Sequence, residues 1–202
     1  MSASPAHYDR LCFPPRYTNS MPPEEHIAEH GTHDNPFTRE DVLSILREHS
    51  WVTGDPCPEH LAFSERACSL LGHFAIDRAG LDALLQLVFT YDAKHSLETP
   101  EAHAVLTRYA ARDVIRELAR AVLDPTPFTS DRFKEVVAHL KGKLELRGRD
   151  LFHPIRLALA GLAGEGELDR VILLVDEAAA LPFAVPIKSI RARVIEFCSV
   201  LD

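Results

Sequence analysis

The chain has 202 residues, 46% of them hydrophobic and 26% charged, so it is long enough to bury a core and has an ordinary globular composition. Its formal charge of −8 argues against indiscriminate nucleic-acid or DNA binding, and no run of about 18 apolar residues predicts a membrane span. The first residues lack the pattern of a secretory signal, and we expect a cytoplasmic protein with reduced cysteines.

Residues 1–36 contain six of the fourteen prolines, which predicts an extended or flexible arm. His26, His30 and His33 lie in this arm at the i, i+4, i+7 spacing that would share one helix face and could bind zinc. Because the stretch is acidic and bounded by prolines, we favour a solvated segment over a metal site. We expect no cofactor.

Residues 37–125 read as a helical subdomain. Thr38 is a candidate N-cap for a short helix that ends near His49, and Pro58 is well placed to open a second helix that runs to about Gly72. A third helix covers residues 81–88, where leucines recur at the helical period. Thr99 then caps a long helix through Tyr109 to Val122, which Pro125 and Pro127 end.

Residues 126–202 read as a second helical subdomain. A helix from Ser130 carries an apolar face to Leu144, and a turn at Arg147–Arg149 follows it. Asp150 is expected to cap a short helix that has Pro154 in its first turn and closes at Gly161. Two more helices cover residues 167–180 and 187–200. No strand pattern is present, so the prediction is an all-α helical bundle of two packed subdomains.

The charge is unevenly distributed along the chain. The first 60 residues hold ten acidic against four basic side chains, whereas residues 132–156 hold seven basic against three acidic ones. An acidic protein can carry a local basic face of this kind. A second basic group near the C-terminus consists of Lys188, Arg191 and Arg193.

The stretch from Arg147 reads RGRDLFHPIRLALAGLAGEGEL, a basic-glycine-basic turn followed by an apolar pair, proline, an aliphatic residue, arginine and a small apolar run that ends in glycine. It resembles the C-terminal anticodon-binding domain of bacterial-type glutamyl-tRNA synthetases, and the likeness extends over about residues 61–182. Ala160 departs from the pattern, because the family has threonine there. The resemblance implies the helical fold of the class I synthetase anticodon-binding superfamily. It also implies a tRNA-binding module without the catalytic half.

The candidate RNA contacts share a positive charge or lie in the glycine turn: Arg147, Gly148, Arg149, Arg156, Lys141, Lys143, Lys188, Arg191 and Arg193. We expect the guanidinium groups of Arg147, Arg149 and Arg156 to face solvent together beside an open helix start, where a phosphate meets backbone N–H groups. Arg156 has an equally weighted structural alternative, in which it pairs with a carboxylate.

No constellation of residues indicates catalysis, so we expect no enzyme activity from this chain alone. The expected partner is tRNA, at its anticodon region, with a separate synthetase-type catalytic protein as a further candidate. The competing hypothesis is a protein-interaction module that keeps the helical scaffold and has lost RNA binding.

Overall fold

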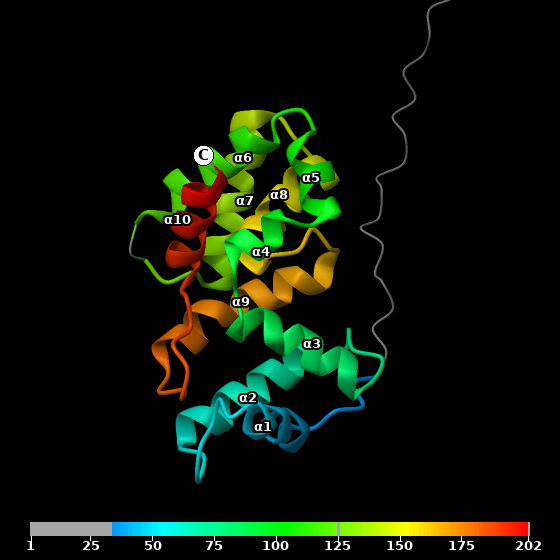
Figure 1. The fold of residues 1–202 in the computed structure, drawn as a ribbon, viewed down its shortest axis with the longest axis vertical. Helices are drawn as coiled ribbons and strands as arrows, with labels where there is room; N and C mark the ends of the chain where they lie inside the picture. The colour runs from blue at the N-terminus through cyan, green and yellow to red at the C-terminus, as the bar shows by residue number, and fades with distance from the viewer. Residues whose placement is uncertain (1–33, 125, 202) are drawn as a thin grey trace, which may run out of the picture. The chain divides into compact units, whose positions relative to one another are not determined.

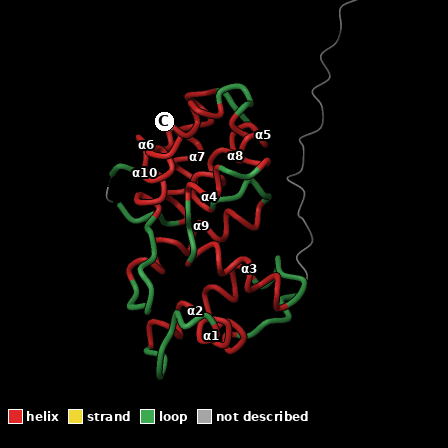
Figure 2. The backbone as a smooth tube through the Cα atoms, viewed as in Figure 1, coloured by secondary structure: helices red, strands yellow, loops and turns green. Residues whose placement is uncertain are grey.

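A computed structural model describes residues 34–124 and 126–201, all of which belong to one compact unit. The described residues form ten helices and no strand, as predicted (Figure 2). The helices are α1 Arg39–Glu48, α2 Pro58–Leu71, α3 Arg78–Phe89, α4 Ala93–Leu97, α5 Pro100–Leu106, α6 Ala111–Val122, α7 Ser130–Leu144, α8 Arg149–Ala160, α9 Gly166–Ala180 and α10 Ile190–Leu201.

Helix α9 lies between two groups of helices (Figure 1). On one side it packs against α2 and α3, which lie with α1. On the other side it packs against α8 and α10, which lie with α4, α5 and α6. Five consecutive side chains from Val171 to Val175 are buried, because α9 has neighbours on both sides.

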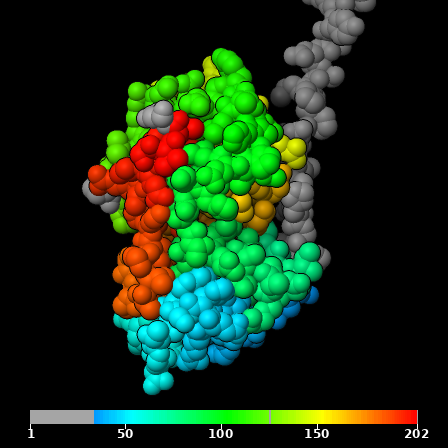
Figure 3. All heavy atoms as spheres, viewed as in Figure 1, coloured from blue at the N-terminus to red at the C-terminus, as the bar shows by residue number. Residues whose placement is uncertain are grey.

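The segment between α9 and α10 joins the two groups of helices. It runs down one side of the unit to the α1–α2 region and back to α10, which the space-filling view shows in orange and red (Figure 3). The amide of Ala184 donates to the Trp51 carbonyl across 2.8 Å. Phe183 packs edge-on against Phe63 and Phe89, with ring centres 5.2 and 4.9 Å away. Aromatic burial of this kind fixes the segment in place.

Several helix boundaries agree with the sequence analysis. Thr38 and Asp41 form a capping box at α1, Pro58 opens α2, and Thr99 caps α5. The end of α8 at Gly161 is also confirmed, since this glycine has the left-handed φ of 83°. The division into subdomains at residues 37–125 and 126–202 stays a prediction, and helices from both segments pack together at α9.

The long helix predicted from Thr99 to Val122 was wrong, because the chain breaks into α5 and α6. Ala110 takes a left-handed conformation with φ 61°, and Tyr109 is 89% exposed rather than part of an apolar face. Both helices pack against α8. No glycine or proline marks this break, so the packing of two short helices overrides the local helical propensity.

The start of α8 also differs from the prediction. Gly148, not Asp150, is the N-cap residue, and Pro154 is the sixth residue of the helix. Its missing N–H leaves the carbonyl of Asp150 without its usual helical partner. Asp150 is exposed, so water can satisfy that carbonyl and the helix continues. The short helix α4 was not predicted.

Candidate nucleic-acid interface

The turn between α7 and α8 places its basic residues on the outside of the protein. Glu145 ends α7 with a left-handed φ of 56°, and Gly148 has φ 55° and ψ −139°, a conformation that is essentially limited to glycine. The Gly148 carbonyl accepts from the amides of Leu151 and Phe152, at 3.2 and 3.0 Å, and so starts α8. Gly148 thus lets the chain turn sharply between Arg147 and Arg149.

Four basic side chains predicted to bind RNA are exposed around this turn. Arg147 and Lys141 have no hydrogen bond or ion pair with any residue that the structure describes. Arg149 is 71% exposed on its side chain and pairs with Glu165 at 3.3 Å. Lys143 donates to Glu117 at 2.6 Å. The Arg149–Glu165 pair is exposed and therefore weak, so Arg149 remains available to a competing anion, whereas the carboxylate partner of Lys143 is buried.

Arg156 does not belong to this exposed group, and the expectation that it faces solvent with Arg147 and Arg149 was wrong. Its side chain is 8% exposed, and Nε and Nη2 donate to the two oxygens of Asp169 at 2.8 and 2.9 Å. Nη1 donates to the carbonyl of Gly164 at 2.9 Å. Arg156 therefore joins α8 to the loop between α8 and α9, through Gly164, and to the first turn of α9, through Asp169. This is the structural alternative named for it.

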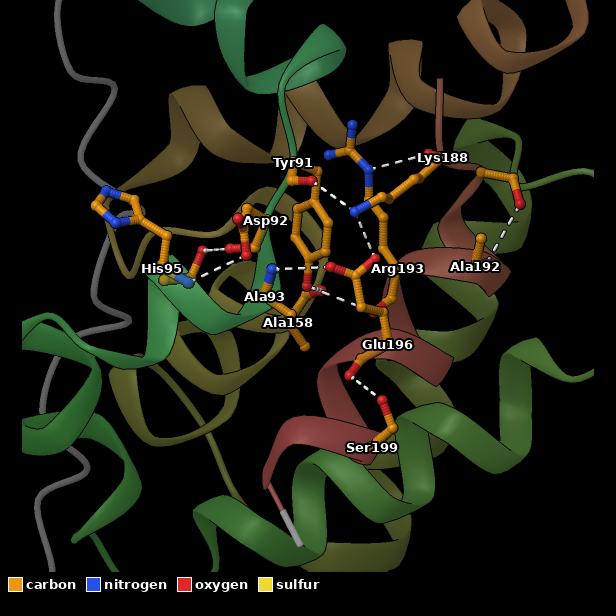
Figure 4. A network of polar contacts seen from close by, with 12 residues as sticks. Tyr91, Asp92, Ala93, His95, Ala158, Lys188, Ala192, Arg193, Glu196 and Ser199 are labelled. Carbon is orange, nitrogen blue, oxygen red and sulfur yellow. Dashed lines mark hydrogen bonds and ion pairs between the residues drawn. The ribbon is translucent and has the colours of Figure 1, made fainter. Parts of the chain in front are cut away.

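Arg193 is fully buried, which corrects its assignment to a second basic surface (Figure 4). Its guanidinium group donates to four backbone carbonyls, of Leu87, Val88, Leu159 and Lys188, at 2.5 to 3.1 Å. Burial lowers its pKa to about 10, so it stays charged at neutral pH.

Tyr91 lies beside Arg193 in the same network. The Arg193 guanidinium carbon lies 4.7 Å from the centre of the Tyr91 ring, and the Tyr91 hydroxyl donates to the Ala158 carbonyl at 2.7 Å (Figure 4). Burial raises the pKa of Tyr91, so the hydroxyl stays protonated and keeps this bond. The network joins α8, α10 and the α3–α4 connection.

The other two members of the C-terminal basic group are more accessible. Lys188 is exposed, and its Nζ forms an ion pair with Glu196 at 2.6 Å and donates to the Tyr91 carbonyl at 2.9 Å. Arg191 is exposed and lines a pocket with Asp124 and Asp176. Lys188, Arg191 and Arg193 thus do not form one basic patch.

Sequence reasoning missed a row of arginines on α6. Arg112, Arg116 and Arg120 are exposed and follow one another at intervals of four residues, which place them on one face of α6, and the exposed Arg108 precedes them in the α5–α6 turn. That spacing was the signal that could have identified them. Arg116 pairs with Asp113 at 2.7 Å, and Arg120 pairs with Glu117.

Two contacts place this row beside the α7–α8 turn. Glu117 bridges Arg120 and Lys143, and both interactions hold the pKa of its carboxyl below the usual value, with the Lys143 hydrogen bond the larger cause. Arg108 lies 3.8 Å from Asp150 at the start of α8. We call the combined set the basic surface: Arg108, Arg112, Arg116, Arg120, Lys141, Lys143, Arg147 and Arg149.

His153 lies behind the basic surface on α8. Its Nε2 is buried without a hydrogen-bond partner among the residues described. Burial lowers the pKa of His153, and nearby Arg108, Arg156 and Arg149 lower it further, while Glu165 acts in the opposite direction. The ring is therefore held in its neutral form.

The metal alternative lies outside the described residues, because His26, His30 and His33 fall within residues 1–33. Among residues 34–124 and 126–201, no three histidine, cysteine or acidic side chains are arranged to hold a metal ion. None of the helices in the same ranges combines the length and apolar character needed to cross a membrane.

The fold and this surface define an all-helical protein with an exposed basic region. A stretch of 41 residues is 49% identical to glutamate–tRNA ligase 2 of Coxiella burnetii strain RSA 331 and to glutamate–tRNA ligase 1 of strain CbuG_Q212. It covers 20% of this chain and 9% of each ligase. No protein-family model and no solved structure matches the chain. The chain therefore contains a region related to glutamate–tRNA ligases.

Proposed function

We propose that the chain is a tRNA-binding module similar to the C-terminal anticodon-binding domain of glutamyl-tRNA synthetases, and that it binds an unpaired loop such as the anticodon. The observation that carries this proposal is the exposed basic surface, which includes both arginines of the Arg147–Gly148–Arg149 turn of the resembling stretch. The ligase-related region of 41 residues supports it independently of the geometry.

The electrostatics of the surface suit a ribose-phosphate chain. Eight exposed cationic side chains lie on α6, α7, α8 and the turns beside them, and the carboxylate partners of this set are Asp113, Glu117, Asp150 and Glu165. The pairs with the solvent-accessible Asp113, Asp150 and Glu165 contribute about 0–1 kcal/mol each, so phosphates can replace these three carboxylates, whereas Glu117 is buried. Release of counterions from the RNA then favours binding.

We further propose that the chain performs no chemistry by itself and needs no cofactor. Adenylation by a class I synthetase uses a nucleotide-binding α/β region, whereas the described residues are helical. The catalytic part would belong to a separate synthetase-type protein or to another part of a longer chain, and the complex would act in the cytoplasm.

Filter binding of the full chain to tRNAGlu across a salt series tests the proposal. Three or four phosphate contacts predict a slope of log K against log salt of about −2 to −3.5. Arg147→Gln/Arg149→Gln is expected to weaken binding at low salt by about tenfold and to make the slope shallower by about 1.5. Its free energy of unfolding should change by less than about 0.5 kcal/mol, because both side chains are exposed.

The matched control is Arg39→Gln/Arg47→Gln, which removes the same charge from exposed positions on α1. It should leave the salt slope unchanged. Absence of tRNA retention by the wild-type chain at low salt contradicts the proposal. Binding of a purified synthetase catalytic protein without RNA would then favour the protein-interaction module.

A further inference from the structure

Tyr109 exposes its ring to solvent in the turn between α5 and α6. Its side chain is 89% exposed, whereas Tyr91, the other tyrosine of the described ranges, is 7% exposed. Tyr109 also has no hydrogen bond or ring contact with the residues that the structure describes. A ring in this setting contributes little to the core.

The backbone on both sides of Tyr109 is held in place. Arg108 donates its amide to the Val105 carbonyl at 3.1 Å, and Ala111 donates to the Arg108 carbonyl at 3.3 Å. Val105 and Ala111 are buried. The left-handed φ of Ala110 reverses the chain directly after Tyr109. The turn therefore presents the ring outward from a fixed position.

Two exposed arginines flank Tyr109 in the chain. Arg108 precedes it and reaches Asp150 at the start of α8, next to Arg149 in the chain. Arg112 follows it on the first turn of α6 and is exposed. An aromatic anchor for a protein partner usually lies in a packed, water-excluding pocket, and this one does not. Exposed aromatic rings next to cations are the arrangement that binds single-stranded nucleic acid.

We propose that Tyr109 stacks on an unpaired base of a single-stranded RNA loop while the basic surface binds the neighbouring phosphates. This inference rests on the proposed function and deepens it, because it names the side chain that contacts an unpaired base and the stacking by which it does so. Bases within a duplex are stacked on each other and present no free face to a protein ring.

Fluorescence titration of the full chain with two RNA probes tests this inference. The first probe is the tRNAGlu anticodon stem–loop with 2-aminopurine at one loop adenine, and the second is a duplex of equal length with no loop. Tyr109→Ala should weaken binding to the stem–loop by about 5- to 100-fold and abolish stacking-dependent quenching. The salt slope should stay unchanged, because no charge is removed.

Two control variants separate stacking from other effects. Tyr109→Phe keeps the ring and should bind the stem–loop like the wild type. Ile76→Ala removes an equally exposed side chain, also 89% exposed, from the turn before α3 and should also leave binding unchanged. The Tyr109→Ala and wild-type chains should bind the duplex equally.

The results distinguish the two proposals. Equal stem–loop binding by wild type and Tyr109→Ala overturns the stacking role while the tRNA-binding function stands. Weak binding by Tyr109→Phe also overturns it, because the hydroxyl rather than the ring would then be responsible. Failure of the wild-type chain to bind either probe removes both proposals.

Discussion

Arginines occupy opposite environments at the α7–α8 turn and in the interior of the protein. Arg147 and Arg149 are exposed, whereas Arg156 and Arg193 are buried with each guanidinium group bonded inside the protein. Arg193 joins α10 to the distant helix α3, Arg156 joins α8 to the neighbouring helix α9, and the two exposed arginines stabilise little. An arginine in a basic stretch is thus an RNA contact or a structural cross-link according to the acceptors that the fold brings to it.

The largest effect should come from Arg193, if the interior region is structural. Arg193→Met leaves the carbonyls of Leu87, Val88 and Leu159 without their donor, and the free energy of unfolding should fall by about 3–5 kcal/mol. Urea denaturation followed by circular dichroism measures this change. Arg191→Met, two residues away and exposed, should cost less than about 0.5 kcal/mol. An equal loss of unfolding free energy in the two variants would contradict the structural role of Arg193.

Arg156 should come next. Arg156→Met removes the paired bonds to Asp169 and the bond to the Gly164 carbonyl, with an expected loss of about 2–3 kcal/mol in the same assay. The exposed neighbour Arg170→Met serves as the control. The salt slope for tRNA should not change, because Arg156 is not part of the basic surface. A shallower salt slope for tRNA binding by Arg156→Met would show that Arg156 contacts the RNA.

A substitution at Gly148 tests whether the α7–α8 turn depends on its glycine. Gly148→Ala places a Cβ on a backbone with φ 55° and ψ −139° and should cost about 1–3 kcal/mol in thermal or urea unfolding. It should also weaken tRNA binding, because the turn positions Arg147 and Arg149. Gly142→Ala lies within α7 with open space around the new methyl group and should stabilise by about 0.5–1 kcal/mol. Equal responses at the two glycines would contradict this account of the turn.

His153 should give the smallest effect, seen as a pH dependence. Its pKa in the folded protein is lowered below the ordinary 6.5 by burial and by Arg108, Arg156 and Arg149. The unfolded chain therefore binds the proton more readily, and stability present above pH 6.5 is lost as the pH falls through the lower, folded value. His153→Gln should make the fall in unfolding free energy between pH 7.5 and 5.5 shallower. An unchanged pH profile in this variant would show that the ring does not contribute.

Much of the fold could be predicted because the signals are local. Apolar spacing, the N-caps Thr38 and Thr99 and the first-turn proline Pro58 lie within or next to the helices they indicate. The break at Ala110 carries no such signal, since alanine favours helix and only the packing of α5 and α6 on α8 imposes a left-handed residue. The position of Pro154 in α8 was mispredicted for a local reason: Asp150 was taken as the cap, whereas the helix begins at the Gly148 turn.

The candidate site was only partly predictable. Arg147, Arg149, Lys141 and Lys143 are exposed around the predicted turn, while α6 and the turn before it approach this region through Glu117–Lys143 and Arg108–Asp150, which span more than 20 residues of sequence. Their role in RNA binding stays a prediction. The exposure of Tyr109 could not be predicted, because an aromatic residue at a helical position normally indicates a buried face.

By itself, the sequence determined that the chain is helical, where most helices start and end, and where positive charge is concentrated, because these depend on neighbouring residues along the chain. Only the tertiary structure decided which arginines are exposed. A guanidinium group is buried where backbone carbonyls or a carboxylate from other helices replace its hydration, and those acceptors for Arg156 and Arg193 come together only on folding.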